Sequence, residues 1–337
     1  MKDEKVIYVT VKEIANICGV SVATISRVFN EPDKVKPETR QKVLETAQKY
    51  GYTPHAVAKS LRTKRTGVYS LTVMSGVERV FEDSYVSKFL KGAVSYFSSH
   101  GLKLIIDVFT SGDVVKYYKN LIASKLVDGY ILMDIKDDDI RVDLFNELNV
   151  PYVCVGRNNK NNFIYVDTDN YSGGFQAGKH LAEIGCKDVL FVGGEPALPF
   201  EKQRLHGFID GFSGSQGVIY KEYGFYEEKN VKDIVKKYLD KVDGIFCTSD
   251  VMAYAALRVF EENSMNIPII GFDNIILSEI ANITTIDQNI HMVGEKVAEK
   301  VHTLVLGGDV ESEIIGTQLI IRGTKRFLNS QKGGRGV

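Results

Sequence analysis

The chain has 337 residues, 44% of them hydrophobic and 25% charged, a length that suits two or three domains and a composition typical of globular proteins. No apolar run approaches the roughly 18 residues of a membrane span, and the charged N-terminus MKDEKVIYVTVKEIAN lacks the apolar segment of a signal peptide. The four cysteines have no metal-ligand spacing and are expected to be buried, reduced thiols: Cys18, Cys154, Cys186 and Cys247. These features predict a cytoplasmic protein with no membrane segment, metal site or cofactor.

Charge is distributed unevenly along the chain, although its formal net charge is only -1. Residues 1–65 hold 13 Lys and Arg against 7 Asp and Glu, a net charge of +6, so the remainder carries -7. A basic head on an acidic body is expected to meet a polyanion. The alternative is a chance segregation of surface charge.

The head, residues 1–53, is expected to begin with two short helices. Thr10-Val11-Lys12-Glu13 fits a capping box, so the first helix begins at Val11. Gly19 ends it, because glycine readily adopts the left-handed conformation of a sharp turn, and Ser21 caps the second helix. The expected inward-facing residues are Ile14, Ala15 and Ile17, followed by Ile25, Val28 and Phe29.

A third helix is predicted to brace this pair. It starts at Pro37, a favoured first helical position, and runs to Tyr50, with Gly51 as its stop. Its expected apolar residues are Val43, Leu44 and Ala47. Two short helices joined by a turn with glycine and braced by a third form a helix-turn-helix. The predicted fold class of the head is therefore a small all-α helix-turn-helix headpiece.

The second helix, within SVATISRVFN at residues 21–30, mixes hydroxyls, small apolar side chains and one arginine. A recognition helix places its N-terminal residues against base edges and its hydroxyls against phosphates. Short side chains allow the helix to sit deep in the major groove, and Arg27 can reach guanine, the most common specific contact of arginine. The alternative is a capped surface helix.

The head resembles the lactose-repressor (LacI/GalR) family of bacterial transcription regulators over VTVKEIANICGVSVATISRVFNEPDKVKPETRQKVLETAQKYGYTPHAVAKSLRTKRT. By this resemblance the base-reading residues are Val22, Ala23 and Arg27. The residues that contact phosphates are Ser21, Thr24, Ser26, Asn30 and Tyr52. For Ser26 and Tyr52 the alternative is that they brace the headpiece.

Residues 54–66 are expected to form a hinge helix and a basic linker. The hinge segment PHAVAKSL is too short to be stable alone, and in the family it folds when two subunits sit on DNA. The resemblance places Ala58 and Leu61 at the DNA, with Leu61 as a wedge in the minor groove at the centre of the operator. His55 stands where the family commonly has asparagine, a better cap, which predicts weaker or pH-sensitive folding of the hinge.

From Gly67 the pattern changes to short apolar runs that alternate with helical segments: VYSLTV, LKLIID, DGYILM, DVLFVGG, DGIFCT and IPIIGF. This alternation predicts α/β architecture with parallel sheets and helices on both faces. In such sheets ligands bind beyond the carboxyl ends of the strands. Candidate site residues therefore come just after these runs.

The body also resembles the family's two-lobed, periplasmic-binding-protein-like core, with three chain crossings between the lobes. The matching motifs are YVDTDNYSGGFQAGKHLAEIG, QRLHGF, CTSDVMAYAALRVF, IIGFDN and ITTIDQN. Within a core of residues 67–330, the first lobe is expected at about 67–165 and 288–315, and the second at about 166–287 and 316–330. The tail, 331–337, has no heptad leucines, which predicts a homodimer rather than a tetramer. SGGFQAG lacks the spacing of a nucleotide loop, and its glycines are expected to let a helix start pack closely on a sheet.

The cleft between the lobes is the predicted effector site. Arg204, Ser249, Asp273 and Gln288 combine donors and acceptors suited to a sugar. By resemblance they line the cleft together with Tyr85, Phe200 and Tyr226. The alternatives are a fixed salt bridge for Arg204 and core packing for Phe200 and Tyr226, while Asp250 is expected to cap the next helix.

Two departures from the family pattern leave the effector open. Gly156 stands where many members carry an aspartate before Arg157, which predicts the loss of one polar sugar contact. Phe200 occupies a position that is often polar in the family.

The predicted function is a DNA-binding transcriptional regulator, favoured as a repressor of carbohydrate-utilisation genes. It is expected to bind operator DNA as a dimer and to respond to a small-molecule effector, with a sugar favoured. No nucleophile elbow, phosphate loop, metal cluster or His-Asp pair indicates an enzyme, so no catalytic residue is predicted. The alternatives are a free-standing sugar-binding protein, which the basic head disfavours, a regulator governed by a phosphorylated carrier protein, and a regulator with a purine-type effector.

Overall fold

A computed structural model describes residues 9–52, 65–74, 83–160, 162–214 and 217–323 of the chain. The described chain forms two compact units, one within residues 1–66 and the other within residues 67–337. The predicted hinge helix, with Ala58 and Leu61, lies outside the described residues.

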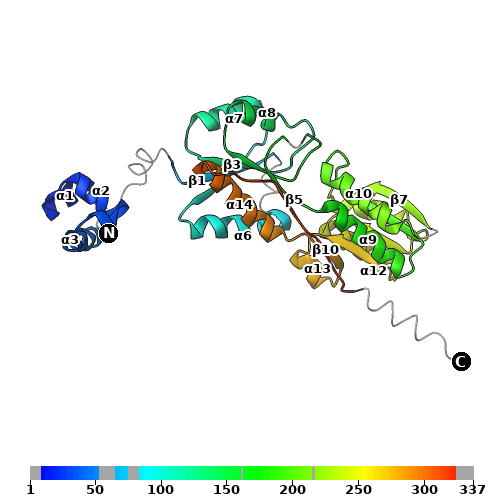
Figure 1. The fold of residues 1–337 in the computed structure, drawn as a ribbon. Coiled ribbons are helices and arrows are strands. Elements are labelled where there is room, and N and C mark those ends of the chain that lie inside the picture. The colour runs from blue at the N-terminus through cyan, green and yellow to red at the C-terminus, as the bar shows by residue number, and fades with distance from the viewer. Residues whose placement is uncertain (1–8, 53–64, 75–82, 161, 215–216, 324–337) are drawn as a thin grey trace, which may run out of the picture. The chain divides into compact units, whose positions relative to one another are not determined.

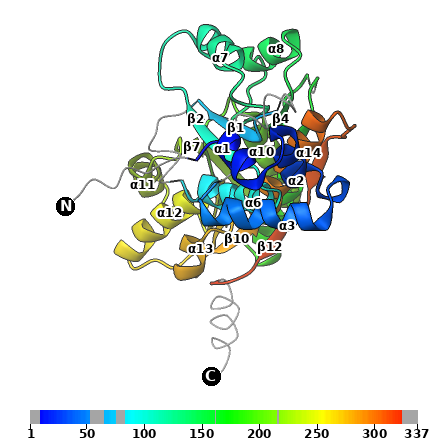
Figure 2. The ribbon, with the colours of Figure 1, turned by 90° about the vertical axis from the view of Figure 1, so that its left-hand side faces the viewer.

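The head unit is a small helical domain, shown with its labelled helices in Figure 1: α1 Val11–Cys18, α2 Val22–Asn30, η1 Pro32–Lys34 and α3 Pro37–Lys49. The capping box at Thr10 and Glu13 is present, and Gly19 has the left-handed conformation expected after α1. Pro37 starts α3 as predicted. Figure 2 shows the three α-helices packed together from a second side.

The core of the head differs from the prediction in two residues. Ile14, Ala15, Ile25, Val28, Val43 and Ala47 are buried as expected. Ile17 is 47% exposed and Leu44 is 40% exposed. The buried side of α1 continues instead to Cys18, which lies one helical turn beyond Ile14 and Ala15.

The first sheet of the body unit has six strands in the order β11-β5-β4-β3-β1-β2. All of its pairs are parallel. Helices α6 and α14 cover one face of the sheet, and α7 and α8 cover the other. The bounds are β1 Val68–Val73, α6 Ser84–Ser99, β2 Lys103–Val108, α7 Val114–Ala123, β3 Gly129–Leu132, α8 Ile140–Glu147, β4 Tyr152–Val155, β5 Tyr165–Thr168, α14 Ile290–Leu306 and β11 Glu313–Ile315.

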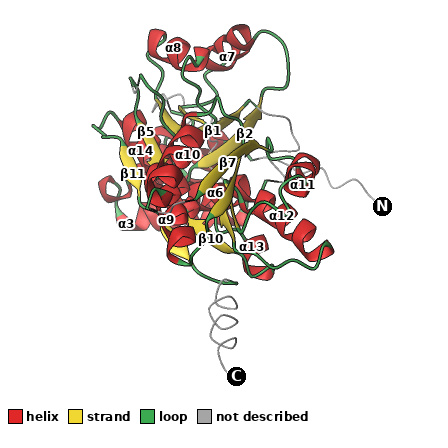
Figure 3. Cartoon of the chain, turned by 90° about the vertical axis from the view of Figure 1, so that its right-hand side faces the viewer, coloured by secondary structure: helices red, strands yellow, loops and turns green. Residues whose placement is uncertain are grey.

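The second sheet has six strands in the order β12-β10-β9-β8-β6-β7, of which β12 runs antiparallel to β10. Helices α9 and α10 cover one face, and α11 and α12 cover the other, so each sheet lies between helices (Figure 3). The bounds are α9 Asn170–Glu183, β6 Asp188–Gly193, α10 Pro199–Phe212, β7 Val218–Tyr223, α11 Glu228–Lys236, β8 Gly244–Cys247, α12 Asp250–Glu262, β9 Ile269–Phe272, α13 Ile276–Ile280, β10 Thr284–Asp287 and β12 Gln318–Ile320.

The chain passes between the two sheets after β5, after β10 and between β11 and β12. The first crossing comes later than the lobe bounds drawn from the sequence, because residues 166–168 continue β5 in the first sheet. This strand pairs with both β4 and β11, and those two pairings keep it in the first lobe. This segment of the first lobe therefore ends at Thr168, and α9 of the second lobe begins at Asn170.

The glycines of SGGFQAG allow close packing, as predicted, but against two different partners. A Cβ at Gly173 would meet Phe272 and Ile286 of the sheet, whereas one at Gly174 or Gly178 would meet the backbone of α10. Helices α9 and α10 thus pack closely at the positions of these glycines.

We expect Gly174→Ala to destabilise the body unit by about 1–3 kcal/mol, the usual cost of overpacking. A Cβ there would lie 2.1 Å from the carbonyl oxygen of Arg204, so α10 would have to move. Gly214→Ala is the control, since a Cβ at Gly214 meets nothing within 4 Å. Chemical denaturation measures the difference, and equal midpoints for the two variants would contradict the packing argument.

Candidate functional site

The exposed side of α2 presents the predicted base-reading residues. Ser21 caps the helix by accepting from the Thr24 backbone N–H, and its hydroxyl also lies 2.9 Å from that of Thr24. Val22, Ala23 and Arg27 are exposed, while Thr24 and Ser26 are half-buried. A short-chain surface with one arginine is therefore available at the N-terminal part of the helix.

Tyr52, in contrast, belongs to the core of the head. Its side chain is buried, and its ring meets that of Phe29 edge-on at a centroid distance of 6.1 Å. Burial raises the pKa of Tyr52. These contacts favour the bracing role that the sequence left as an alternative. Asn30 is the last residue of α2.

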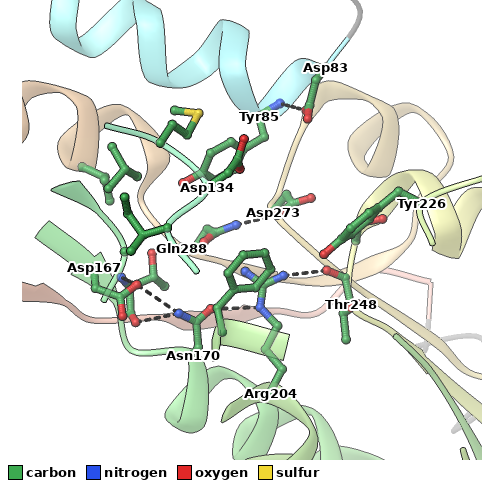
Figure 4. Close-up of a pocket in the computed structure, with 18 of the residues that line it drawn as sticks. Asp83, Tyr85, Asp134, Asp167, Asn170, Arg204, Tyr226, Thr248, Asp273 and Gln288 are labelled. Atoms are coloured by element: carbon green, nitrogen blue, oxygen red, sulfur yellow. Dashed lines mark hydrogen bonds between the residues drawn. The ribbon is translucent and has the colours of Figure 1, made fainter. Parts of the chain in front are cut away.

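The body unit contains a cavity of about 540 Å³ at the carboxyl ends of strands from both sheets. All seven predicted effector residues line it: Tyr85, Phe200, Arg204, Tyr226, Ser249, Asp273 and Gln288. Figure 4 shows Tyr85 reaching into the cavity from α6 and Arg204 from α10. The structure thus brings together residues that are up to about two hundred positions apart in the chain.

Arg204 is buried at the floor of the cavity without a carboxylate partner among the described residues. Its Nε donates to Asn170 Oδ1 at 2.9 Å, and its Nη1 donates to the Thr248 carbonyl at 2.8 Å. Its guanidinium carbon also lies 3.8 Å from the Phe272 ring centroid and 4.8 Å from that of Phe200. The fixed salt bridge considered from the sequence is therefore not what holds Arg204, and Nη2 makes no hydrogen bond to the described residues.

Asp273 follows β9 and carries positive φ, 117°, a conformation that few non-glycine residues adopt. Its carboxylate accepts from Gln288 Nε2 at 2.5 Å. Burial, with the nearby charge of Asp250, raises the pKa of Asp273 well above its ordinary value. The cavity therefore holds a desolvated carboxyl group whose charged form gains from a hydrogen-bond donor on a ligand.

Tyr226 is fixed by a glutamate behind the cavity wall. Its hydroxyl donates to Glu201 Oε1, and the same oxygen accepts from Thr248 Oγ1 at 2.9 Å. Glu201 is buried, and burial raises its pKa. Tyr226 and the adjacent Phe225 both line the cavity, and both have positive φ. Their rings therefore belong to the cavity wall rather than to the packed core.

Ser249 lines the cavity as predicted and also caps a helix, whereas Asp250 has a different role from the one predicted. Ser249, a predicted effector contact, is the N-cap of α12, and its Oγ accepts from the Met252 N–H at 3.2 Å. Asp250 was expected to cap that helix, but it binds the Ile275 N–H at 2.8 Å and the Thr285 hydroxyl instead. The reason is that Asp250 is the first helical residue, so its side chain faces the β9 and β10 ends.

Sequence reasoning missed a polar group on the first-lobe side of the cavity. Asp167, at the end of β5, pairs with Arg157 through Nε at 3.1 Å and accepts from Asn170 Nδ2 at 3.2 Å. A Cβ added at Gly156 would lie 4.0 Å from Asp167 Oδ1. The carboxylate of Asp167 therefore lies next to the place that a side chain at position 156 would occupy. Asp83 and Asp134 also line the cavity.

Within the described residues there is no group of three or more His, Cys, Asp or Glu side chains that could hold a metal ion. In the same part of the chain no helix is long and apolar enough to cross a membrane. All four cysteines are buried and unpaired with one another.

A helical head with short side chains and one arginine exposed on α2, followed by two α/β lobes around a polar cavity, is the arrangement of a DNA-binding protein with a ligand-binding core. Two family models match the chain in these parts: bacterial regulatory proteins, lacI family, over residues 10–55, and the periplasmic binding protein domain over residues 79–309. The chain therefore belongs to the lacI family of bacterial regulatory proteins, and its function is transcription regulation.

Similar proteins extend over nearly the whole chain. The HTH-type transcriptional regulator CelR of Thermobifida fusca is 28% identical over 93% of this chain and 97% of its own length. The transcriptional repressor PurR of Mannheimia succiniciproducens is also 28% identical, with the same coverage. A solved complex of a regulator CelR with cellobiose is 25% identical, has a TM-score of 0.71, and covers 93% of this chain and 99% of its own.

Proposed function

We propose that the protein is a repressor of carbohydrate-utilisation genes that binds a near-palindromic operator as a homodimer and is released from it by a sugar. The observation that carries the proposal is the cavity of about 540 Å³. It is lined by the buried Arg204 and the buried carboxyl group of Asp273, together with aromatic side chains. Arginine donates and aspartate accepts, which together suit the hydroxyls of a sugar. The aromatic rings of Phe200 and Tyr226 offer flat apolar faces for a sugar ring.

The relatives support a sugar without deciding which one. A relative of this chain is known in complex with cellobiose, and another is named as the transcriptional repressor PurR. The residues proposed to contact the effector are Tyr85, Phe200, Arg204, Tyr226, Asp273 and Gln288, with Ser249 as a wall residue. The head surface of Val22, Ala23 and Arg27 is proposed to read bases, and the hinge residues Ala58 and Leu61 to contact the minor groove. A protein with this function works in the cytoplasm, beside the chromosome, and needs no catalytic group.

The test is a titration of the purified full-length protein with cellobiose, maltose, glucose, hypoxanthine and guanine, followed by calorimetry. We expect one of the sugars to bind and to lower affinity for an operator selected from random DNA. Binding of a purine alone would replace the sugar by the purine-type alternative. A panel without any binder would instead favour control by a phosphorylated carrier protein.

Operator binding itself is expected to be steeply salt-dependent, because basic side chains of the head replace counterions on the phosphates. If about six or more phosphates are contacted, affinity should fall by on the order of a thousandfold between roughly 50 and 200 mM salt. Fluorescence anisotropy of a labelled operator measures the slope. A flat salt response would contradict DNA recognition by the head.

A further inference from the structure

A chain of hydrogen bonds crosses from the first lobe to the second along the wall of the cavity. It starts at Arg157, which follows β4, and passes through Asp167 and Asn170 to Arg204 on α10. Figure 4 shows its central part, from Asp167 through Asn170 to Arg204 and Thr248. Asp167 and Asn170 flank the point where the chain passes between the sheets.

The geometry of Asn170 admits one orientation of its amide. Nδ2 donates to Asp167 Oδ1 at 3.2 Å and to the Thr168 carbonyl at 3.0 Å, so Oδ1 faces Arg204 Nε. A flipped amide would point its donors at a guanidinium, which only donates, and its acceptor at two groups that only accept. Asn170 is 1% exposed, so water cannot replace these partners.

The orientation of Asn170 in turn sets the direction of the Arg204 guanidinium. Asn170 accepts from Nε and the Thr248 carbonyl accepts from Nη1. Because the guanidinium is planar, these two bonds fix its orientation. Of the five N–H donors of the guanidinium, one on Nη1 and two on Nη2 then remain for a ligand. The other end of the chain also reaches α10, because Arg157 Nη2 donates to Gln203 Oε1 at 3.1 Å. Arg157 thus links the first lobe to the helix that carries Arg204.

We propose that Asp167 and Asn170 are positioning residues for effector recognition, in which ionised Asp167 orients Asn170 and Asn170 orients Arg204 toward the ligand. This inference rests on the proposed function only for the identity of the ligand. Neither residue needs to touch the effector to fulfil this role. Their contribution is the direction of the donor on Arg204 and its connection to Arg157 across the lobes.

The protonation state of Asp167 gives the proposal a specific signature. Burial raises the pKa of Asp167 to about 6, although the positive charges of Arg157 and Arg204 and the hydrogen bonds from Thr168 N–H and Asn170 oppose the rise. The other carboxyl groups that line the cavity are Asp83, Asp134 and Asp273. Above pH 6 the ionised carboxylate accepts from Asn170 and pairs with Arg157. Below pH 6 it becomes neutral, and the orientation of Arg204 should loosen.

A tryptophan reporter tests this without any ligand, because the chain contains no tryptophan. Phe200→Trp places an indole where the Phe200 ring lies 4.8 Å from the Arg204 guanidinium carbon, so its emission senses the position of Arg204. We expect a pH transition of the emission near 6 in the full-length reporter protein. Asp167→Asn should remove that transition, and Asn170→Asp, which sets two carboxyl groups against each other, should shift the emission at neutral pH.

Asn120→Asp is the matched control, since Asn120 is an exposed residue of α7. It makes the same chemical change and should leave emission and pH transition as in the parent reporter. An unchanged pH transition in Asp167→Asn, or unchanged emission in Asn170→Asp, would overturn the proposal. Asp167→Asn decides alone if Asn170→Asp does not fold.

Calorimetry with cellobiose and maltose, in proteins that keep Phe200, then measures the effect on binding. We expect Asn170→Asp to weaken binding of the responding sugar by about tenfold or more at neutral pH, the consequence of losing a hydrogen bond to a charged group. Asp167→Asn should flatten the pH dependence of binding around 6. If neither sugar binds the parent protein, the sugar assignment fails, while the ligand-free emission still decides the positioning roles.

Discussion

Replacement of Arg27 by alanine is expected to weaken operator binding by about 1–3 kcal/mol, which is roughly 5- to 150-fold. The same change should affect binding to random DNA far less. Arg27 is exposed on α2 next to the small side chains Val22 and Ala23, so it can reach further into a major groove than its neighbours. An arginine that forms a bidentate pair with guanine contributes discrimination of this size. Anisotropy titrations with operator and scrambled duplexes measure both affinities.

Arg258→Ala provides the control for the loss of one positive charge. Arg258 lies on α12 of the body unit, where it pairs with Glu261 at the surface at 3.1 Å. Its removal should change neither affinity appreciably. If Arg27→Ala and Arg258→Ala bound both duplexes alike, α2 would not be the helix that reads sequence.

The start of the head and the sheet pattern of the body follow from the sequence because their causes are local. The capping box at Thr10 and Glu13 and the glycine after α1 act within a few residues, and the structure has both. Ile17 was misplaced because the register of a short helix against its neighbours depends on tertiary packing. Cys18 turned out to provide the buried contact instead.

The cleft residues could be named where each directly follows a strand, as Asp273 follows β9 and Gln288 follows β10. Asp167 and Asn170 could not, because their partners are distant in sequence: Arg204 lies 34 residues from Asn170. In the same segment, Asp169 caps α9. Glu201 lies in the first turn of α10, a common place for an acidic residue. Its burial depends on donors from Tyr226 and Thr248 in two other segments.

Asp273→Asn is expected to abolish the ligand response of operator binding while it increases the stability of the folded protein. Asparagine has nearly the same volume, tolerates positive φ, and can still accept from Gln288. It cannot offer the charged acceptor that a sugar hydroxyl would use, a loss of about 1.5–3 kcal/mol or roughly 10- to 150-fold in ligand affinity. Anisotropy of the labelled operator, with and without the responding sugar, measures the change.

The increase in stability follows from the raised pKa of Asp273. A carboxyl group whose pKa is higher in the folded than in the unfolded state is stabilising while it is protonated, and this contribution is lost as pH rises through the folded pKa. The asparagine variant removes that loss, so its advantage over the parent should grow with pH. Thermal unfolding between acidic and neutral pH tests the trend. A variant less stable than the parent at every pH would show that the carboxylate is held by donors that the structure does not contain.

Arg204→Ala is expected to lose the same ligand response with the opposite effect on stability. It leaves Asn170 Oδ1 and the Thr248 carbonyl without their donors in a buried place, at a cost of about 1–3 kcal/mol for each unsatisfied group. Operator affinity without ligand should stay within a few-fold of the parent, because the head is a separate compact unit. Since a ligand can shift DNA affinity only through its preference for one lobe arrangement, both variants should remain bound at sugar concentrations that release the parent. If both variants were released from the operator at the sugar concentration that releases the parent, the effector site would not be this cavity.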